Sequence, residues 1–297
     1  VRSPRAERKK TMESSSFDLA ADLGVLRMRF GRLIRENKLK LPVFSGTAAE
    51  ILELCNSDAC DARELADLVQ GDVSIAGHVL RVANSAAYAP EEPIVSLQQA
   101  VSRLGMSTLC EIALGIAVRA EVFAVEGFEK RLDELWRHSA ATGAWSKEIA
   151  RLRRKNVEGA YLGGLLHDVG MPVCLQAGID LCAEEKIDVT EELVESLMDE
   201  LHGEVGGTML ERWKMPEWMS SVCRHHHYPD NATSWREEVA AVGLADRLAH
   251  WSLDEESSEE EIIRSLPALE TLGLYSDELD TLFERASHVA QQAEAVS

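Results

Sequence analysis

The sequence has 297 residues, and 51 aspartates and glutamates outnumber 31 lysines and arginines, which gives a formal net charge of −20. A surface with this excess of negative charge repels phosphate backbones, so we expect no nonspecific binding of nucleic acid. Hydrophobic residues make up 45% of the chain, which excludes a disordered protein.

The sequence shows neither a signal peptide nor an apolar run near the ~18 residues that span a bilayer. Its six cysteines form no C-x-x-C pair, and most of them lie in apolar helical stretches. We therefore expect buried free thiols, a cytoplasmic location and no membrane association.

Residues 1–20 are predicted to be a flexible tail, because they begin with a basic, polar and aperiodic stretch. Beyond them, apolar residues recur at spacings of three and four, without a sustained period-two run, so the predicted fold class is all-α. Thr47 with Glu50, and Asp61 with Glu64, have the spacing of capping boxes at helix starts.

The central part of the chain is predicted to contain helices over about 72–88, 106–122 and 128–154. The last of these ends in a basic cluster within residues 151–155, which suits the negative end of a helix better than it indicates a phosphate site. Asn156 is predicted to cap the next helix, which continues to Asp168. Its paired glycines, Gly163 and Gly164, would allow a close contact with another helix.

Two acidic segments follow. Residues 183–200 hold eight carboxylates and one lysine, and residues 254–261 hold six carboxylates and no base. Both are expected to be solvated. The second is predicted to be a linker that separates a terminal pair of helices, at about 259–295, from the main body, so residues 252–297 form an extension.

Several histidines occupy inward-facing positions of predicted helices. His202 lies on the stripe that includes Val205 and Met209, and His226 extends a second apolar stripe. A single histidine of this kind is more often hydrogen-bonded in a core than bound to a metal. Together with the carboxylates, however, the histidines form a ligand set that suits a first-row divalent metal. The candidates, from five helices, are Glu134, His138, His167, Asp168, His202, His226 and Asp246.

The string Tyr161-Leu-Gly-Gly-Leu-Leu-His-Asp-Val-Gly170 resembles the central motif of the HD superfamily of metal-dependent phosphohydrolases. The wider chain, over about residues 34–250, resembles the HDOD branch of that superfamily. The matching pieces are Leu41-Pro42, Arg81-Val-Ala-Asn-Ser-Ala86, Ala100-Val-Ser-Arg-Leu-Gly105, Trp136-Arg-His-Ser139, and Trp213-Lys-Met-Pro216 followed by His226-His227. This resemblance implies a helical HDOD domain over residues 21–251, with an N-terminal lobe at about 34–125 and an HD-like lobe at about 126–251.

The resemblance also implies roles for individual residues. His138, His167, Asp168, His202 and Asp246 match the metal positions of the superfamily. The pair His226-His227 matches the double histidine of the related HD-GYP branch, and Glu134 fits that branch's additional carboxylate.

Two departures from the HD-GYP pattern argue against cyclic di-guanylate hydrolysis. Met171 stands where that branch has a lysine, which removes a cation that would meet substrate phosphate. The Gly-Tyr-Pro loop is also absent, because Tyr228-Pro229-Asp230-Asn231 follows the histidine pair.

The preferred hypothesis is a bacterial signal-transduction module of the HDOD type that acts through contacts with a protein partner. It would retain a site for one to three divalent ions of iron, manganese, nickel or zinc. The alternative is a phosphohydrolase acting on a nucleotide or cyclic nucleotide, in which Asp168 bridges two metals and a small phosphate compound is the ligand. A di-iron redox protein and a metal-free core are further alternatives.

Overall fold

The structure is a computed structural model that describes residues 19–42, 46–55, 62–85, 88, 92–254 and 259–296. In these ranges every regular element is a helix, which confirms the all-α prediction. The first helix, α1 (Leu19–Arg35), already includes the last two residues of the predicted tail, and the rest of that tail lies outside the described ranges. Asp61 also lies outside them, and Thr47 lies within α2 rather than at its N-cap.

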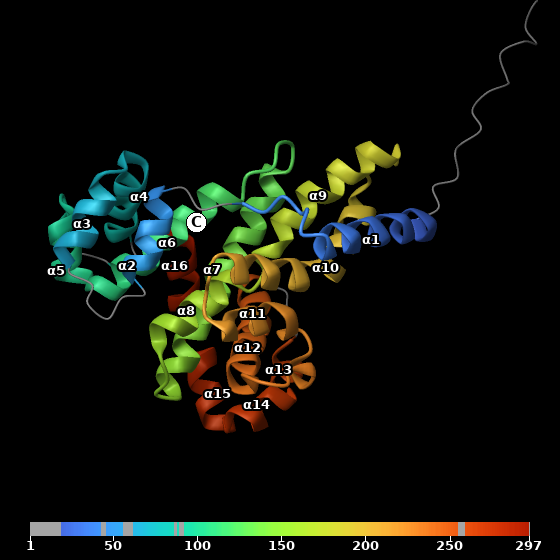
Figure 1. Ribbon diagram of the computed structural model, residues 1–297. Helices are drawn as coiled ribbons and strands as arrows, with labels where there is room; N and C mark the ends of the chain where they lie inside the picture. The colour runs from blue at the N-terminus through green and yellow to red at the C-terminus, as the bar shows by residue number, and fades with distance from the viewer. Residues whose placement is uncertain are drawn as a thin grey trace, which may run out of the picture.

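The N-terminal lobe consists of four short helices packed together and against the longer α6 (Figure 1). The helices are α2 (Gly46–Cys55), α3 (Ala62–Gln70), α4 (Val73–Ala83), α5 (Leu97–Leu104) and α6 (Met106–Val122). Asn84 closes this lobe, because its side-chain amide both donates to and accepts from the backbone of Ile94 at 2.8 Å.

The central element is α7 (Glu129–Leu152), which packs against α8 (Val157–Leu166) and α12 (Arg236–Leu253). A Cβ atom on Gly164 of α8 would lie 2.5 Å from Ser146 Oγ and 2.6 Å from the Thr142 carbonyl oxygen. Only glycine permits this approach, which confirms the close helix contact predicted there. Asn156 caps α8, as expected, by accepting from the Gly159 amide at 2.8 Å.

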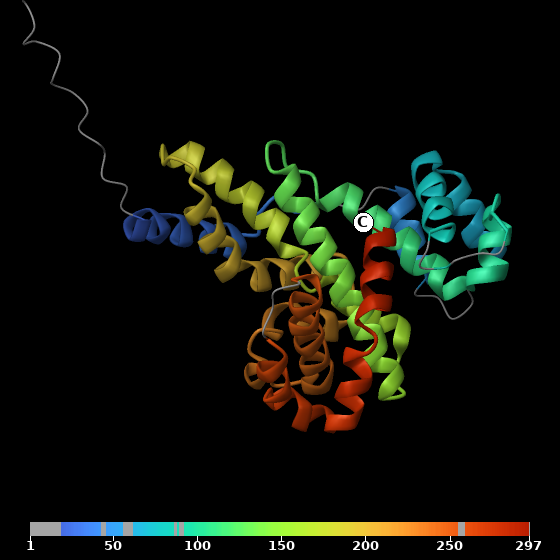
Figure 2. The same cartoon turned by 180° about the vertical axis from the view of Figure 1, so that it is seen from behind.

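The HD-like lobe continues through α9 (Gly170–Glu185), α10 (Glu191–Arg212), α11 (Glu217–His225), the 3₁₀ turn η1 (Pro229–Asn231) and α12. In both views α1 lies beside α9 and α10, apart from the small N-terminal helices (Figures 1 and 2). The acidic stretch 183–200 is not wholly solvated, since it includes the first half of α10, where Leu193, Val194 and Leu197 are buried.

The terminal extension differs from the helical pair predicted. Its described residues form four helices, α13 (Glu260–Arg264), α14 (Pro267–Leu272), α15 (Ser276–Phe283) and α16 (Ala286–Val296). They are not held apart from the main body, because Ile263, Leu279 and Val289 share one apolar cluster with residues of α7 and α12. After the turn at α15, α16 runs back along α7 and reaches α6 (Figure 2). Residues 255–258 of the predicted linker lie outside the described ranges, and the apolar residues that follow them pack on the main body, which the sequence pattern alone does not reveal.

The cysteines follow the prediction in part. Cys174, Cys182 and Cys223 are free and buried, and burial raises the pKa of each thiol. Cys110, in contrast, is disulfide-bonded. Pairing depends on proximity in the fold, so the absence of a C-x-x-C spacing did not exclude it.

Hydropathy over the described helices gives no candidate for a bilayer-spanning segment.

Candidate metal centre

Seven of the eight predicted ligands come together in two adjacent groups. In each group the candidate ligand atoms lie within 4.8 Å of one another. The first group contains Asp168, His202, His226 and His227, and the second contains His138, His167 and Asp246. These side chains come from α7, the turn between α8 and α9, α10, the end of α11 and α12.

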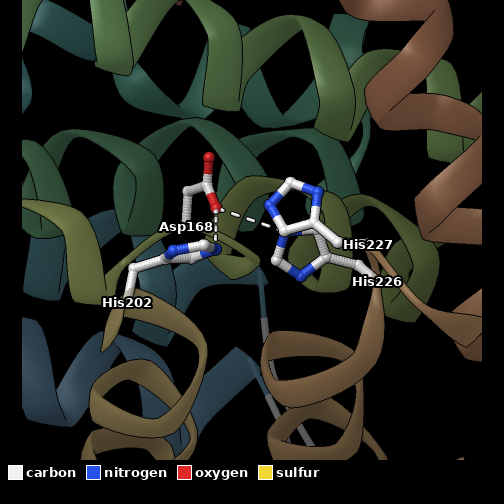
Figure 3. A group of neighbouring side chains, drawn as sticks. All are labelled: Asp168, His202, His226 and His227. Atoms are coloured by element: carbon white, nitrogen blue, oxygen red, sulfur yellow. Dashed lines mark ion pairs between the residues drawn. The ribbon is translucent and has the colours of Figure 1, made fainter. Parts of the chain in front are cut away.

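Asp168 lies between the two groups. Its Oδ1 is 3.4 Å from both His202 Nε2 and His226 Nε2 (Figure 3). Its Oδ2 is 3.3 Å from His167 Nε2. A carboxylate with its two oxygens directed at different ligand groups is suited to bridge two cations.

Asp246 is the carboxylate of the second group. Its Oδ1 lies 2.9 Å from His138 Nε2 and 3.7 Å from His167 Nε2, and its Oδ2 lies 4.0 Å from His227 Nδ1. His227 belongs to the first group, which contains Asp168. Its half-exposed imidazole therefore lies near a carboxylate of each group.

The backbone fixes the orientation of three imidazole rings. Nδ1 of His167 lies 2.7 Å from the Gly164 carbonyl oxygen, and Nδ1 of His202 lies 2.8 Å from that of Met198. His226 Nδ1 lies 3.1 Å from the Val222 carbonyl oxygen. A carbonyl oxygen only accepts, so each Nδ1 carries a proton, and in the neutral ring the Nε2 lone pair is available to a metal.

These Nε2 atoms fit a metal ion better than they fit a metal-free core. Nε2 of His167, His202 and His226, and Oδ1 of Asp168, are buried and make no hydrogen bond to any described residue. Buried polar atoms are nearly always paired, and burial lowers the pKa of His202, so the Nε2 lone pair of this neutral ring repels the Asp168 carboxylate that it faces. A divalent cation between them removes both penalties, so the donor set indicates a divalent metal site.

Opposite charges and burial together set the protonation of the metal-free cluster. Burial alone would raise the pKa of Asp168, but the facing imidazoles, first among them His167, hold that pKa well below its usual range. Burial opposes protonation of His167, yet the carboxylates of Asp168 and Asp246 raise its pKa to about 10. Burial and the nearby His226 lower the pKa of His227 to about 4. Protons and metal ions therefore compete for these sites.

Close backbone packing holds the Asp168 turn against α10. A Cβ atom on Gly170, the first residue of α9, would lie 2.1 Å from the His202 carbonyl oxygen and 2.6 Å from the Gly206 amide nitrogen. The candidate ligands Asp168 and His202 are thus positioned relative to each other by the backbone contact of Gly170, two residues after Asp168, with α10.

Glu134 does not join the cluster. Its side chain is 50% exposed and lies 3.7 Å from Lys130 Nζ and 3.9 Å from Arg131 Nη1. Residues four apart share a face of a helix, but the rise of about 6 Å between them places Glu134 a full turn from His138.

The basic cluster within residues 151–155 is accounted for by ion pairs, including that of Lys155 Nζ with Glu237 at 2.9 Å.

The structure adds one residue that the sequence left without a role. His250 Nε2 lies 3.6 Å from Asp246 Oδ1, and its ring centroid is 4.3 Å from that of His138. The signal was present in the sequence, because His250 follows Asp246 by four residues on the same helix.

Comparison with known proteins identifies the family. The HDOD domain model matches residues 41–229. The chain belongs to the HDOD family, and the resemblance found in the sequence is confirmed. An HDOD domain protein of unknown function from Geobacter sulfurreducens has the same fold, with a TM-score of 0.67 at 24% identity, over 94% of this chain and 98% of that one.

Two further relatives are more distant in sequence. A structure from Shewanella amazonensis, whose name assigns it provisionally to the metal-dependent phosphohydrolases, has a TM-score of 0.69 at 19% identity and covers 92% of this HDOD chain and 99% of its own. An uncharacterized protein of Treponema pallidum is 22% identical over 235 residues. That alignment covers 76% of this chain but only 45% of the relative, so the chain spans less than half of that protein's length.

Proposed function

We propose that this HDOD protein is a signal-transduction module with a two-metal centre, in which Asp168 bridges the ions. The observation that carries the proposal is the set of buried Nε2 atoms of His167, His202 and His226, which face carboxylates without a hydrogen bond. The proposed ions are first-row divalent metals, because neutral imidazoles and carboxylates are their ordinary ligands.

The burial of Met171 supports a regulatory role over hydrolysis. Its side chain is 8% exposed and belongs to the main apolar core, so this position supplies neither a cation nor a polar contact to a phosphate. In this proposal the module acts through a signalling protein partner, and metal occupancy sets the conformation that the partner meets.

The second candidate is a metal-dependent phosphohydrolase, which the complete ligand set around Asp168 favours. When bound, divalent ions polarise phosphoryl oxygens and acidify a coordinated water. The residues of this chain would hold the ions in place: the backbone carbonyls fix the imidazoles of His167 and His202, and Asp168 joins the two groups.

Metal analysis tests the proposal. Purified protein reconstituted with Mn²⁺ or Fe²⁺ should hold two ions per chain, and His226→Ala should lose at least one of them. His225→Ala is the matched control, because it removes a neighbouring imidazole that belongs to neither ligand group. Wild-type protein that holds no metal, or equal metal content in both variants, would contradict the proposal.

Hydrolysis assays separate the two candidates. The loaded protein should show no turnover of bis(p-nitrophenyl) phosphate or of cyclic dinucleotides if the module is regulatory. Metal-dependent turnover that disappears in Asp168→Asn would instead establish the phosphohydrolase.

A further inference from the structure

A cavity of about 290 Å³ lies between α7, α8, α11 and the start of α12, apart from the metal centre. No candidate metal ligand is among the residues that line it. Its volume is close to the lower limit of small-molecule sites, which occupy roughly 300–1,000 Å³. The cavity therefore has room for a small organic molecule, and the residues around it indicate which kind.

Hydrocarbon and indole groups form the apolar part of the lining. Ile149 comes from α7, Ala160 from α8, and Val242 from α12. Trp218 of α11 and Trp235, which precedes α12, add two indole rings. Burial of apolar surface against these side chains would drive the binding of a ligand with an apolar body.

Trp235 has a backbone conformation that its own helix does not explain. Its φ is 59° and its ψ is 32°, in the left-handed region, which is unfavourable for a bulky residue. Its side chain makes no capping hydrogen bond to α12, and the residue is 41% exposed. Strained backbone positions are typical of sites that hold ligands. We attribute the tryptophan at this position to the cavity that it lines.

The charges in the lining are already compensated, so the cavity does not select a charged ligand. Arg153 and Lys155 both pair with Glu237, at 3.0 and 2.9 Å. Glu238 lies in the first turn of α12, where the positive end of the helix dipole stabilises a carboxylate. These two cations and two carboxylates sum to zero net charge. A complementary ligand is therefore uncharged.

The lining also contains a hydroxyl group without a partner. Ser146 of α7 is 1% exposed, and its Oγ makes no hydrogen bond to any described residue. Buried hydroxyl groups nearly always have a partner, because an unpaired one lowers stability. A ligand with one hydrogen-bonding group would provide that partner.

Ser146 links the cavity to the metal centre. Its Oγ packs against Gly164, where a Cβ atom would lie 2.5 Å away. The carbonyl oxygen of Gly164 lies 2.7 Å from His167 Nδ1 and fixes the orientation of that imidazole. A ligand bonded to Ser146 would hold this contact in place, and groups that orient metal ligands raise metal affinity.

We propose that this cavity is an effector site for an uncharged molecule with an apolar body and one hydroxyl group, and that its occupancy strengthens metal binding at His167. The hydroxyl group of the ligand pairs with Ser146 Oγ, and the apolar body packs against Trp218 and Trp235. The effect on the metal rests on the metal centre proposed above, whereas the binding of the ligand does not.

Calorimetric titration of the metal-free protein with p-cresol tests the site. This probe should bind at least about tenfold more tightly than 4-methylbenzoate and 4-methylbenzylammonium, because an ion would leave water for a cavity whose charges are already compensated. No binding of p-cresol, or equal binding of either charged analogue, would overturn the assignment.

The hydroxyl contact predicts a difference between two probes. Ser146→Ala should weaken the binding of p-cresol about fivefold, because it removes one hydrogen bond, and should leave the affinity for toluene unchanged. Equal effects on the two probes would exclude the proposed contact.

Two variants of the apolar lining have matched controls. Trp235→Gly should weaken p-cresol binding at least about fivefold without lowering the free energy of unfolding, since glycine tolerates the left-handed conformation. Its control, Lys214→Gly, replaces another residue with a positive φ, 56°, outside the lining. Ala241→Phe should fill the cavity and abolish binding, whereas Ala268→Phe should not, although both alanines are partly buried against the same apolar cluster. Wild-type affinity in both Trp235→Gly and Ala241→Phe would place the ligand elsewhere and overturn the proposal.

Titrations with Mn²⁺, in the presence and absence of saturating p-cresol, test the coupling. The ligand should tighten Mn²⁺ binding about fivefold, and Ser146→Ala should abolish this effect. An equal or weaker Mn²⁺ affinity in the presence of p-cresol would overturn the coupling and leave the ligand site intact. A protein that binds p-cresol but takes up no Mn²⁺ would instead overturn the proposed function.

Discussion

Replacing Gly170 by alanine tests whether the backbone contact between α9 and α10 positions the metal ligands. The added methyl group would meet the His202 carbonyl oxygen at 2.1 Å and the Gly206 amide nitrogen at 2.6 Å. Nonbonded heavy atoms are comfortable only at about 3.5 Å, so the helices must separate by roughly 1 Å. Both obstacles are backbone atoms, which no rotamer change can move aside.

The consequence should appear in both stability and metal binding. Overpacking of this kind typically costs about 1–3 kcal/mol, and we expect the unfolding free energy to fall by roughly 3 kcal/mol. Asp168 lies two residues before Gly170, and metal–ligand distances tolerate only about 0.2 Å. We therefore expect metal affinity to fall about 10- to 100-fold, as it does when groups that orient metal ligands are removed.

Urea denaturation and chelator competition measure the two effects, and Gly178→Ala is the control. Gly178 belongs to the same helix, but a Cβ atom there would meet only Leu197 Cδ1, at 3.4 Å. That variant should keep its metal and gain about 0.5–1 kcal/mol from helix propensity. If Gly170→Ala keeps wild-type stability and metal affinity, the claim that this contact positions Asp168 and His202 is refuted.

Two further predictions concern buried charges. Lys147 and Glu111 form a buried ion pair between α7 and α6, so Lys147→Met should lower the unfolding free energy by about 3–5 kcal/mol, and adding Glu111→Leu should restore most of it in urea titrations. A single variant as stable as the wild type would contradict this. In metal-free protein the raised pKa of His167, about 10, stabilises the fold fully below the unfolded value of about 6.5, and that stabilisation is lost as the pH rises towards 10. His167→Gln should therefore flatten the decline in stability between those pH values, and an unchanged profile would count against it.

The sequence predicted which candidate side chains come together better than it predicted their surroundings. His167 and Asp168 belong to a short motif, and His202 and Asp246 lie on helical stripes, and the structure brings these four side chains into one cluster. Glu134 has the same helical spacing from His138, yet it lies one turn too far along α7. The spacing of His250 from Asp246, four residues on α12, was present in the sequence, but the contact of its ring with that of His138 joins helices that are distant in the chain, and local spacing does not predict it.

The terminal extension shows what local patterns cannot provide. Its acidic start has the composition of a solvated linker, and nothing in that composition indicates that Ile263 and Val289 join the apolar cluster formed with α7 and α12. Such packing depends on which apolar faces remain uncovered after the rest of the chain has folded.

Helix α7 carries the proposed metal ligand His138 near its middle, and three other parts of the molecule pack against the same helix. Lys147 ties it to α6 of the N-terminal lobe, α8 packs along it, and α16 of the extension runs beside it. A helix of 24 residues is about 36 Å long. A rotation of α7 about its axis that moved His138 relative to a cation would therefore also shift the contacts of α7 with α6, α8 and α16. Binding of a metal ion at His138 would fix the position of α7 relative to these three helices.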